Sequence, residues 1–319
     1  MPDHAFNPHA KRRFRLDDDG DDRERPFAAH DGEPAFAKRH RPRRLPAPDA
    51  FDAADGLPEG ARWSSWDQPS ASERGPRPYP AWLVTELAAV DTELGILKTG
   101  KEADVFLVRR GVPGTGRSCL LAAKRYRAAD HKMFHRDSAY LEGRRARESR
   151  TARAMARRTS VGREMISTQW AGAEFAALCQ LHVAGAPVPY PAQVIGTEVL
   201  IEFIGEPDGT AAPRLAETRP RGSELASLWD QLVHGLVTLA RLGLAHGDMS
   251  AYNLLAHRGR LVMIDLPQVV DVIANPGGPG FLDRDVANVS KWFTARGLAG
   301  AVPGPGDLAA LLRREAGID

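Results

Sequence analysis

The hydrophobic positions of this chain lie mainly after about residue 80, and their spacing changes along the sequence. Within residues 82–88, apolar side chains recur at helical spacing and predict a short helix. Two apolar runs, residues 105–108 and residues 119–126, flank a Gly- and Pro-rich turn and predict a pair of antiparallel strands. The apolar face of residues 170–184 predicts an amphipathic helix that ends at Gly185, before a Pro-rich stretch that excludes further helix.

The second half of the chain is patterned mostly for helices. Residues 193–204 predict two short strands, and residues 205–222 form a polar linker after them. Two further apolar runs, residues 254–255 and residues 261–264, predict short strands between helical segments. The segments predicted to be helical are residues 223–244, 285–297 and 306–316. The expected fold class is therefore α+β, with a small antiparallel sheet in a first lobe and a reduced set of helices in a second lobe.

The first quarter of the sequence differs from the rest. Residues 1–78 are poor in apolar side chains and rich in Pro, Gly and blocks of like charge, so little apolar area could offset the entropy of ordering them. We expect a disordered charged tail here, which Trp63 and Trp66 could anchor to the folded part. The boundaries predicted for the two lobes are residues 79–204 and residues 205–319.

Composition narrows the class of protein. The 319 residues carry a formal net charge of +2, so no global field favours nucleic acid as the partner. Cys119 and Cys179 are the only cysteines and both stand in apolar runs, which argues against a disulfide framework and favours a reducing cytoplasm. No run is long and apolar enough to span a bilayer, and the N-terminus lacks a signal-peptide pattern. A soluble cytoplasmic protein without membrane partners is expected.

One internal segment departs from this balanced charge. Residues 128–167 are strongly basic and contain enough Ala and Glu to be partly helical. The arginines that give the segment this character are Arg144, Arg145, Arg147, Arg150, Arg153, Arg157, Arg158 and Arg163. Two interpretations stay open: a mobile, solvated insertion, or a phosphate-contacting surface for RNA or a substrate.

The pattern that carries chemistry is H-x-D-x-x-x-x-N at residues 246–253, followed by an apolar strand that ends at Asp265. Phosphoryl transfer from ATP needs a carboxylate that orients or deprotonates the attacking hydroxyl, an amide that shares a metal ion, and a second carboxylate that holds Mg²⁺ against the phosphates. Asp248, Asn253 and Asp265 fit these roles in that order. His246 is expected to pack and hydrogen-bond within the loop rather than to transfer protons.

A buried charge pair is predicted beside this site. Lys124 stands in the apolar strand at residues 119–126, and a charge in such a strand costs free energy unless it is paired. Glu174, on the helix predicted to follow, is the available partner. In kinases, a strand lysine held by a helix glutamate positions the α- and β-phosphates of ATP. The alternative is an edge-strand lysine and an unrelated glutamate on an exposed helix face.

Further nucleotide contacts are predicted on both sides of that strand. The turn before residue 105 lets backbone N–H groups and a lysine approach phosphate oxygens, although the P-loop spacing G-x-x-x-x-G-K-[ST] is absent. Residues 202–204 lie where the lobes join, so their backbone is predicted to bind the adenine edge. The candidate cofactor-binding residues are Thr99, Gly100, Lys101, Val105, Lys124, Glu174, Glu202 and Ile204.

Together these residues resemble the RIO family of atypical serine/threonine protein kinases, nearest the RIO-one branch in a bacterial-type form. The resemblance extends over about residues 80–297, with the matching pieces in the family's order. Those pieces are residues 99–105, 123–124, 170–174, 203–205, 246–253, 264–268 and 281–289. The resemblance implies a two-lobed, protein-kinase-like fold with ATP between the lobes. It also accounts for the Arg-rich insertion, because the family carries a flexible loop before the glutamate helix.

The resemblance also implies an activity. ATP would bind with Mg²⁺, or with Mn²⁺ in its place, and the chain would be a non-specific serine/threonine protein kinase acting on a protein substrate or on itself. ATPase activity is implied as well, because the family's metal-binding aspartate, matched here by Asp265, can accept phosphate transiently. Relatives act in small ribosomal subunit maturation, which would make RNA or ribosomal particles partners through the Arg-rich insertion and the tail.

Two positions differ from the family pattern. Asp265 is followed by Leu266-Pro267 instead of Phe-Gly, and Asp104 replaces an Asn that often stands in the phosphate loop. The extra carboxylate could bind metal or repel phosphate. Two other functions stay open: a nucleotide-gated module that binds RNA or ribosomal particles with little catalysis, and a small-molecule phosphotransferase. The phosphotransferase would need a large substrate-binding region after Asp265, where only about fifty residues follow.

Overall fold

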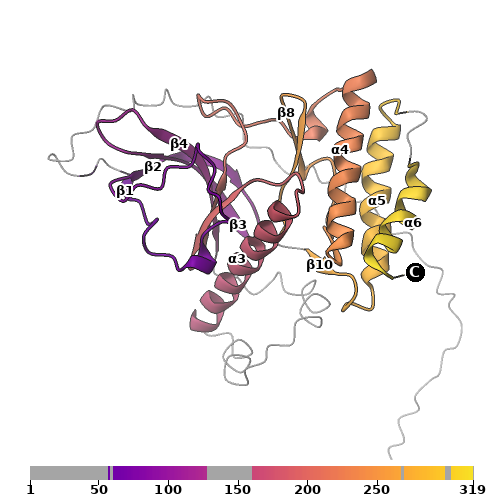
Figure 1. Cartoon of the computed structure of the whole chain (residues 1–319), viewed down its shortest axis with the longest axis horizontal. Coiled ribbons are helices and arrows are strands. Elements are labelled where there is room, and N and C mark those ends of the chain that lie inside the picture. The colour runs from indigo at the N-terminus through magenta and orange to yellow at the C-terminus, as the bar shows by residue number, and fades with distance from the viewer. Residues whose placement is uncertain (1–56, 58–59, 128–159, 267–268, 299–302, 319) are drawn as a thin grey trace, which may run out of the picture. The chain divides into compact units, whose positions relative to one another are not determined.

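An antiparallel sheet with the strand order β1-β2-β3-β4-β6-β5 forms the N-terminal half of the described chain (Figure 1). The computed structural model describes Leu57 and residues 60–127, 160–266, 269–298 and 303–318, all within a unit that spans His40–Asp319. The strands are β1 (Ala61–Trp63), β2 (Val90–Thr99), β3 (Ala103–Gly111), β4 (Ser118–Tyr126), β5 (Pro191–Ile195) and β6 (Glu198–Glu202). The strands predicted from the apolar runs in this region are confirmed.

Helix α3 (Ser160–Val183) packs along this sheet (Figure 1). Its buried residues Ala171 and Phe175 form one hydrophobic cluster with Tyr126 of β4 and Val199 of β6. The helix begins ten residues before the predicted start at residue 170, because good helix formers such as Arg, Glu and Met continue through its first turns. This packing brings the middle of α3 against the C-terminal end of β4.

The C-terminal half is mostly helical. Its helices are α4 (Gly222–Arg241), α5 (Gly278–Thr294) and α6 (Pro305–Ala316), which pack side by side in Figure 1. The short elements are the 3-10 helices η2 (Ala71–Glu73) and η3 (Leu215–Glu217), the pair β7 (Leu244–Ala245) and β10 (Val270–Asp271), and the hairpin β8 (Leu254–His257) and β9 (Arg260–Met263). The predicted α+β class, with a sheet lobe and a helical lobe, is confirmed.

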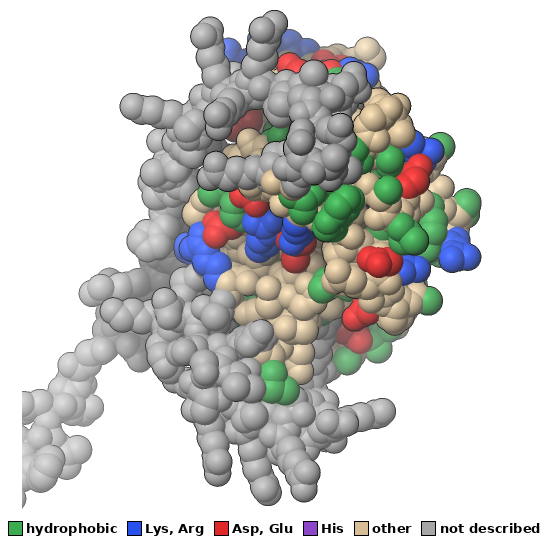
Figure 2. All heavy atoms as spheres, turned by 90° about the vertical axis from the view of Figure 1, so that its left-hand side faces the viewer, with side chains coloured by type: hydrophobic (Ala, Val, Ile, Leu, Met, Phe, Trp, Pro, Cys, Tyr) green, Lys and Arg blue, Asp and Glu red, His purple; other side chains and the backbone are tan. Residues whose placement is uncertain are grey.

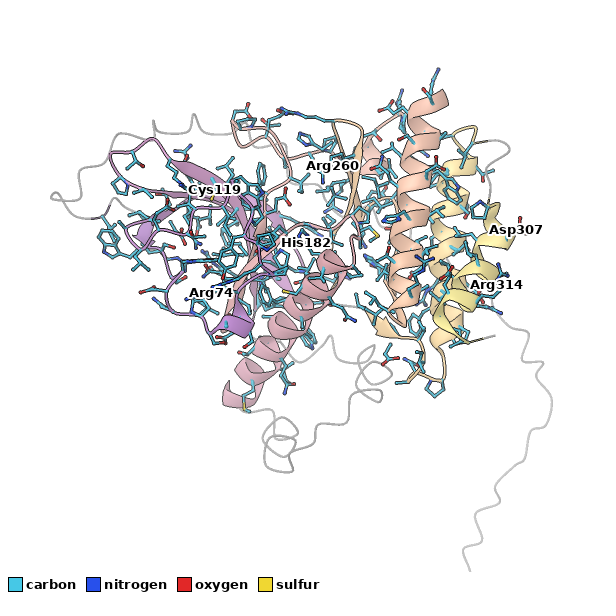
Figure 3. The ribbon with its side chains drawn as sticks, in the orientation of Figure 1. Arg74, Cys119, His182, Arg260, Asp307 and Arg314 are labelled. Atoms are coloured by element: carbon cyan, nitrogen blue, oxygen red, sulfur yellow. The ribbon has the colours of Figure 1, made fainter. Side chains whose placement is uncertain are left out.

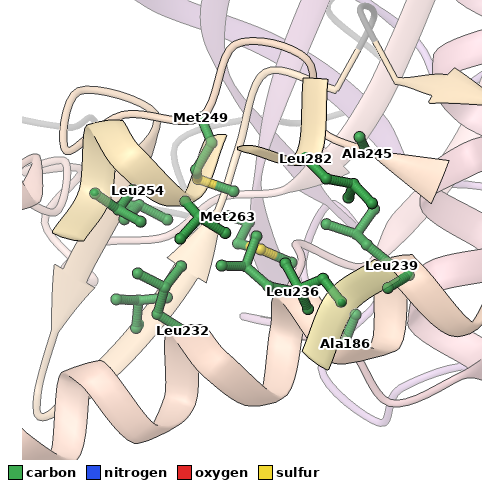
Figure 4. Packing of buried hydrophobic residues seen from close by; sticks show 14 of the residues in the cluster. Ala186, Leu232, Leu236, Leu239, Ala245, Met249, Leu254, Met263 and Leu282 are labelled. Atoms are coloured by element: carbon green, nitrogen blue, oxygen red, sulfur yellow. The ribbon is translucent and has the colours of Figure 1, made fainter. Parts of the chain in front are cut away.

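The largest hydrophobic cluster lies in the helical lobe, between α4, α5 and the short strands. Figure 4 shows Leu232 and Leu236 of α4 beside Met263 at the end of β9, and Leu239 of the same helix near Leu282. Burial of aliphatic side chains stabilises the fold by about 1.5–3 kcal/mol each. The strand end that precedes Asp265 is therefore held by the core of this lobe.

The predicted end of the tail at residue 78 is wrong. β1 pairs with β2, so the sheet already begins at Ala61. Trp66 is buried and makes an edge-to-face contact with Tyr79, with ring centroids 5.1 Å apart, and the guanidinium of Arg74 lies over the Trp66 ring. Low average hydropathy concealed this order, because a single large aromatic side chain supplies much of the buried area. Residues 1–56 lie outside the described residues.

The helix predicted within residues 82–88 is also absent from the described structure, where turns take its place. Helical spacing would put Leu83 and Leu87 on one face, yet Leu83 is buried and Leu87 is 72% exposed. Leu83 and Val84 instead enter the sheet's hydrophobic cluster together, and the Val84 N–H donates to Cys119 Sγ at 3.5 Å. Tertiary burial of two adjacent residues therefore outweighs the helical spacing. Cys119 and Cys179 are both free thiols, as expected.

Candidate active site

The loop of residues 246–253 connects β7 to β8 and carries the exposed side chain of Asp248. Met249, the next residue, is fully buried and packs in the helical lobe's core near Met263 (Figure 4). His246 is also fully buried, and its Nε2 lies 3.1 Å from the carbonyl oxygen of Ile264. The prediction that His246 packs in the protein is confirmed, but its hydrogen bond goes to Ile264 after β9 and not to a residue within the loop. Buried neighbours on both sides therefore fix the loop while Asp248 points to solvent.

Asp285 of α5 clamps the backbone on both sides of Asp248. Its carboxylate accepts the N–H of Gly247 at 2.9 Å and the N–H of Met249 at 2.9 Å. Asn288, one turn later, donates to the carbonyl oxygen of Met249 at 3.2 Å. Burial raises the pKa of Asp285, although His246 and the two N–H donors oppose that rise. The position of Asp248 is therefore set by a buried side chain from a distant helix.

Asn253 links Asp248 to the strand that leads to Asp265. Its Nδ2 donates to the backbone carbonyl of Asp248 at 2.8 Å and to Asp248 Oδ2 at 3.3 Å. Its own carbonyl oxygen accepts the Ile264 N–H at 3.0 Å. Because the amide donors face Asp248, the amide oxygen Oδ1 is the Asn253 atom that could bind a cation.

Three residues in register carry the sheet's side of the site. Lys98 on β2 lies opposite Val105 on β3, and Val105 lies opposite Lys124 on β4. Directly opposed residues in antiparallel strands point to the same face of a sheet. The two lysines therefore share one face with Val105 between them, and this row supplies two positive charges beside an apolar side chain.

Lys124 and Glu174 form the predicted ion pair, with Nζ and Oε1 2.7 Å apart. Glu174 is buried on α3, and its second oxygen accepts the hydroxyl of Tyr126. Burial alone would lower the pKa of Lys124, but the charges of Glu174 and Asp265 outweigh it and raise that pKa. The pKa of Tyr126 is raised by burial and by Glu174. Lys124 is therefore charged, and its position is fixed by the helix carboxylate.

Asp265 follows β9 and connects the helical lobe to the two lysines. Its Oδ1 lies 3.1 Å from Lys124 Nζ, and its Oδ2 lies 3.3 Å from Lys98 Nζ. The residue has φ +68°, a left-handed conformation that Asp tolerates better than most side chains. Burial would raise its pKa, but both lysines hold the pKa well below its usual range. A charged, one-third exposed carboxylate thus lies between the lobes.

The predicted phosphate turn is formed by residues 99–103. The Gly100 N–H donates to the Ala103 carbonyl at 2.9 Å, and a Cβ on Gly100 would lie 2.8 Å from that oxygen. Glycine is therefore required by the close backbone approach. Asp104 pairs bidentately with Arg127, which lowers the pKa of that carboxyl. Its charge is thus already balanced by an arginine.

The segment that joins the lobes lines a pocket of about 240 Å³. Residues 202–205 form one wall, and the β8–β9 hairpin, including Arg260 (Figure 3), forms the other. The Glu202 N–H donates to Tyr190, and the Ile204 carbonyl accepts the Ala212 N–H at 2.9 Å. The Ile204 N–H donates to no residue within the described ranges, which makes it the candidate donor to an adenine edge.

A cation site here would resemble kinase sites in its chemistry. Within the described ranges, no group of three or more His, Cys, Asp or Glu side chains converges on one point. Kinases hold Mg²⁺ with one Asp, one Asn and phosphate oxygens, so Asp265 and Asn253 are a fitting donor set without a third acid.

Among the helices that the structure describes, none is both long and apolar enough to cross a membrane.

Charged side chains on the outside of the sheet are paired. Arg125 contacts Glu198 at 2.6 Å and Glu93 at 2.7 Å, and Arg62 also contacts Glu198. Figure 2, seen from the sheet end, likewise shows Lys and Arg side chains beside Asp and Glu side chains. Most of the Arg-rich segment, residues 128–159, lies outside the described residues. RNA contact through that segment stays a prediction.

The structure therefore brings most of the predicted catalytic residues together in two linked groups. Lys124, Glu174 and Asp265 are in contact, and Asp248 contacts Asn253. Thr99 and Lys101 are exposed at the phosphate turn, and neither is linked to these groups by a described contact. The contacts between the groups run through Ile264.

Three residues of the site were missed by the sequence analysis. Tyr126 stands two residues after Lys124, and strand alternation already placed both on one face. Asp285 interrupts the apolar stripe of α5, which was a signal for a buried carboxylate. Lys98 left no such signal, because its strand was not predicted and its facing depends on the register of three strands.

Comparison with known proteins identifies the family to which this chain is similar. A family model described as the RIO domain matches residues 119–303, which is more than half of the chain. The RIO-type serine/threonine-protein kinase Rio1 of Haloferax volcanii is 34% identical over 210 residues, covering 65% of each chain. The serine/threonine-protein kinase RIO1 of Chaetomium thermophilum is 33% identical over 213 residues, covering 64% of this chain and 40% of the relative. The serine/threonine-protein kinase RIO1 of Caenorhabditis elegans is 32% identical over 205 residues, covering 64% of this chain and 37% of the relative. The chain thus spans less than two thirds of the length of each of these three relatives.

Proposed function

The chain belongs to the RIO domain family, and we propose that it is an ATP- and Mg²⁺-dependent RIO-type serine/threonine protein kinase. Its two-lobed α+β fold is of the protein-kinase type. The observation that carries the proposal is the Lys124–Glu174 ion pair, which extends to Asp265 on the other lobe. Such a network is what phosphoryl transfer from ATP needs, because catalysis of this reaction consists mainly of positioning and charge stabilisation.

Lys124 is the residue proposed to hold the α- and β-phosphates. Glu174 keeps its ammonium charged and fixed, and Tyr126 keeps Glu174 in place. The turn at Gly100 would bring backbone N–H groups and Lys101 to the phosphates. The adenine edge would bind at the segment joining the lobes, with the Ile204 N–H as donor. Bound Mg²⁺ would neutralise charge on the triphosphate, and Asn253 and Asp265 would be its protein ligands.

Asp248 is the residue proposed to orient the attacking group. Its exposed carboxylate would accept a proton from a Ser or Thr hydroxyl, whose oxygen then bonds to the γ-phosphorus as the bond to the ADP oxygen breaks. The Asp285 clamp and the Asn253 contact limit its motion. The acceptor would be a protein substrate or this chain itself, by autophosphorylation.

A second acceptor is Asp265. A carboxylate oxygen of Asp265 would bond to the γ-phosphorus with release of ADP, and water would then hydrolyse the acyl phosphate to free phosphate. The two lysines keep this carboxylate ionised, as a nucleophile requires. The net reaction of this route is ATP hydrolysis, so the protein would serve as a switch.

Incubation of the purified full-length chain with Mg²⁺ and [γ-³²P]ATP tests the proposal. Free phosphate and protein-bound label are both counted, and bound label is treated with hydroxylamine, which releases acyl phosphate but leaves phosphoserine. We expect activity to fall at least about 100-fold in Asp248→Ala and Asp265→Ala. Asp307→Asn, on α6 and far from the sheet (Figure 3), is the control and should retain activity.

If the wild-type chain binds ATP but produces neither bound label nor free phosphate, the kinase proposal is overturned. It would favour a nucleotide-gated module that binds RNA or ribosomal particles through the Arg-rich segment. Falling RNA affinity with rising salt would support that module. No contact among the described residues favours a small-molecule phosphotransferase. A cytoplasmic location stays a prediction.

A further inference from the structure

Lys98 is a residue of the site that the proposed reaction uses only to keep Asp265 ionised. Its Nζ lies 3.3 Å from Asp265 Oδ2, so it takes the carboxylate oxygen that Lys124 does not take. Lys98 lies outside residues 119–303, the part of the chain that the family model matches. Asp265 therefore contacts one lysine from the matched region and one from the strand that precedes it.

Local strand geometry explains how Lys98 reaches this place. The pairing of β2 with β3 shifts register between Ile96 and Lys98, because Leu97 is an extra residue in β2. A bulge of this kind bends its strand and re-aims the following side chains. Lys98 is consequently opposite Val105, in the row that ends at Lys124. The bulge thus places a second ammonium on the face that carries the first.

The surroundings of the two lysines differ. Lys124 has an 11% exposed side chain and keeps Glu174 as a partner whatever Asp265 binds. Lys98 has a 42% exposed side chain, and Asp265 is the acid that it contacts among the described residues. A divalent cation on Asp265 needs a carboxylate oxygen and would displace the more weakly held lysine. Lys98 would then be a mobile cation beside the phosphates bound to the same metal.

We propose that Lys98 is a second phosphate-binding lysine of the nucleotide site, and that it exchanges the Asp265 carboxylate for phosphate oxygens when Mg²⁺ and nucleotide bind. The inference rests on the proposed function, since it assumes that the site takes ATP. Strand β2 would then contribute a phosphate-binding side chain of its own, in addition to the turn at residues 99–103. Lys101 is exposed in that turn, whereas Lys98 already faces the carboxylate proposed to bind the metal.

Isothermal titration calorimetry on the full-length chain can separate phosphate contact from general damage. The titrants are Mg²⁺ with the non-hydrolysable ATP analogue AMP-PNP and, separately, adenosine, which lacks phosphates. The variants are Lys98→Met, which keeps the aliphatic stem, and Lys98→Arg, which keeps the charge. Lys291→Met removes an exposed lysine of α5 and serves as the matched control.

We expect Lys98→Met to weaken AMP-PNP binding about tenfold, a typical loss for one charge-assisted hydrogen bond. Adenosine binding should stay within about twofold, and Lys98→Arg should stay within about threefold of wild type for AMP-PNP. Unchanged or tighter AMP-PNP binding in Lys98→Met would overturn the inference alone. An equal loss for adenosine would also overturn it, because the effect would then be structural. A wild-type chain that binds neither titrant would overturn the proposed function and the inference with it.

Discussion

Arg110 and Lys124 are both buried cations on neighbouring strands of one sheet. They differ in whether the acidic partners in their ion-pair networks are buried or reach solvent. Arg110 donates to both carboxylate oxygens of Asp91, at 2.6 and 2.9 Å, and to Gln193 Oε1 at 3.0 Å. Its side chain and that of Asp91 are 0% and 1% exposed. Lys124 donates to a buried glutamate and to Asp265, which is 33% exposed. One network is closed within the sheet, and the other ends at a carboxylate that solvent reaches.

The difference separates structural from functional use of a buried charge. In the closed network, Gln193 Nε2 also donates to Ser65 Oγ at 2.9 Å, and this hydrogen bond ties the segment after β1 to β5. Nothing in it can change partner without leaving a buried charge unpaired, which costs several kcal/mol. In the open network, Asp265 belongs to the other lobe and can exchange a lysine for another cation. We therefore expect mutations in the first network to change stability and mutations in the second to change nucleotide binding.

The largest stability effect is expected for Arg110→Met. Removing the guanidinium leaves Asp91 buried without its cation, and we expect the free energy of unfolding to fall by about 3–5 kcal/mol. Urea unfolding followed by circular dichroism measures the loss. Arg314→Met, at an exposed position on α6 (Figure 3), is the control and should change stability by less than about 0.5 kcal/mol. A loss below about 1 kcal/mol in Arg110→Met would show that the closed network is not a structural tie.

Asp285→Asn should affect catalysis more than binding. The amide keeps one acceptor oxygen but turns an NH₂ group toward one of the two backbone N–H donors, so the loop that carries Asp248 loses a clamp. We expect a stability loss of about 1–3 kcal/mol and a roughly 10- to 100-fold lower rate of phosphoryl transfer. AMP-PNP affinity should hardly change, because Asp285 does not contact the open network. Equal losses of rate and affinity would contradict this separation.

Tyr126→Phe tests the inner end of the open network. Glu174 loses the hydroxyl donor but keeps Lys124, so we expect a stability loss of about 1–2 kcal/mol. AMP-PNP binding should weaken a few-fold because Lys124 is then less firmly positioned. Calorimetric titration and urea unfolding of the same preparation measure both effects. Unchanged affinity would mean that the Glu174 position does not depend on Tyr126.

The smallest effect is a pH dependence at Asp265. The folded pKa of Asp265 lies below its unfolded value of about 3.9, so the stabilisation is present above that pH and is lost as the pH falls further. Asn tolerates the left-handed backbone, so Asp265→Asn removes mainly the charge. We expect Asp265→Asn to be less stable than the wild type by about 1 kcal/mol at pH 7. That difference should hold to pH 9, since the pKa of Lys124 is raised. Thermal melts from pH 2 to 9 would contradict this result if the difference grew toward low pH.

The contrast between the two networks also explains what the sequence could reveal. Lys124 and Glu174 were found because a charge in an apolar strand requires a partner, and one acid followed on the next helix. Arg110 stands in a similar strand, but its partner Asp91 lies on β2, whose alternation is obscured by Gly95 and a bulge. The helix predicted within residues 82–88 failed because burial against β4 decides the backbone there. Long-range pairing, which sequence spacing does not encode, therefore accounts for most of the differences.

The catalytic loop shows the opposite case. The roles predicted for Asp248, Asn253 and Asp265 depend on residue types at fixed spacing within a loop and the strands after it, and the structure brings these residues close together. The Asp285 clamp comes from a helix 37 positions beyond Asp248, so it could be assigned only once α5 was placed. Local motifs thus locate the chemistry, and the fold identifies what holds it in place.

A charge-conserving exchange tests the distinction between the networks most directly. Arg110→Lys and Lys124→Arg each keep a positive charge but change its shape, and the two side chains are not interchangeable at paired, buried sites. The measurement is the AMP-PNP affinity of both variants with Mg²⁺. We predict that Arg110→Lys binds within about twofold of wild type, although it is less stable, and that Lys124→Arg binds at least about tenfold more weakly. Equal losses in the two variants, or a larger loss in Arg110→Lys, would contradict the assignment of one network to structure and the other to the nucleotide.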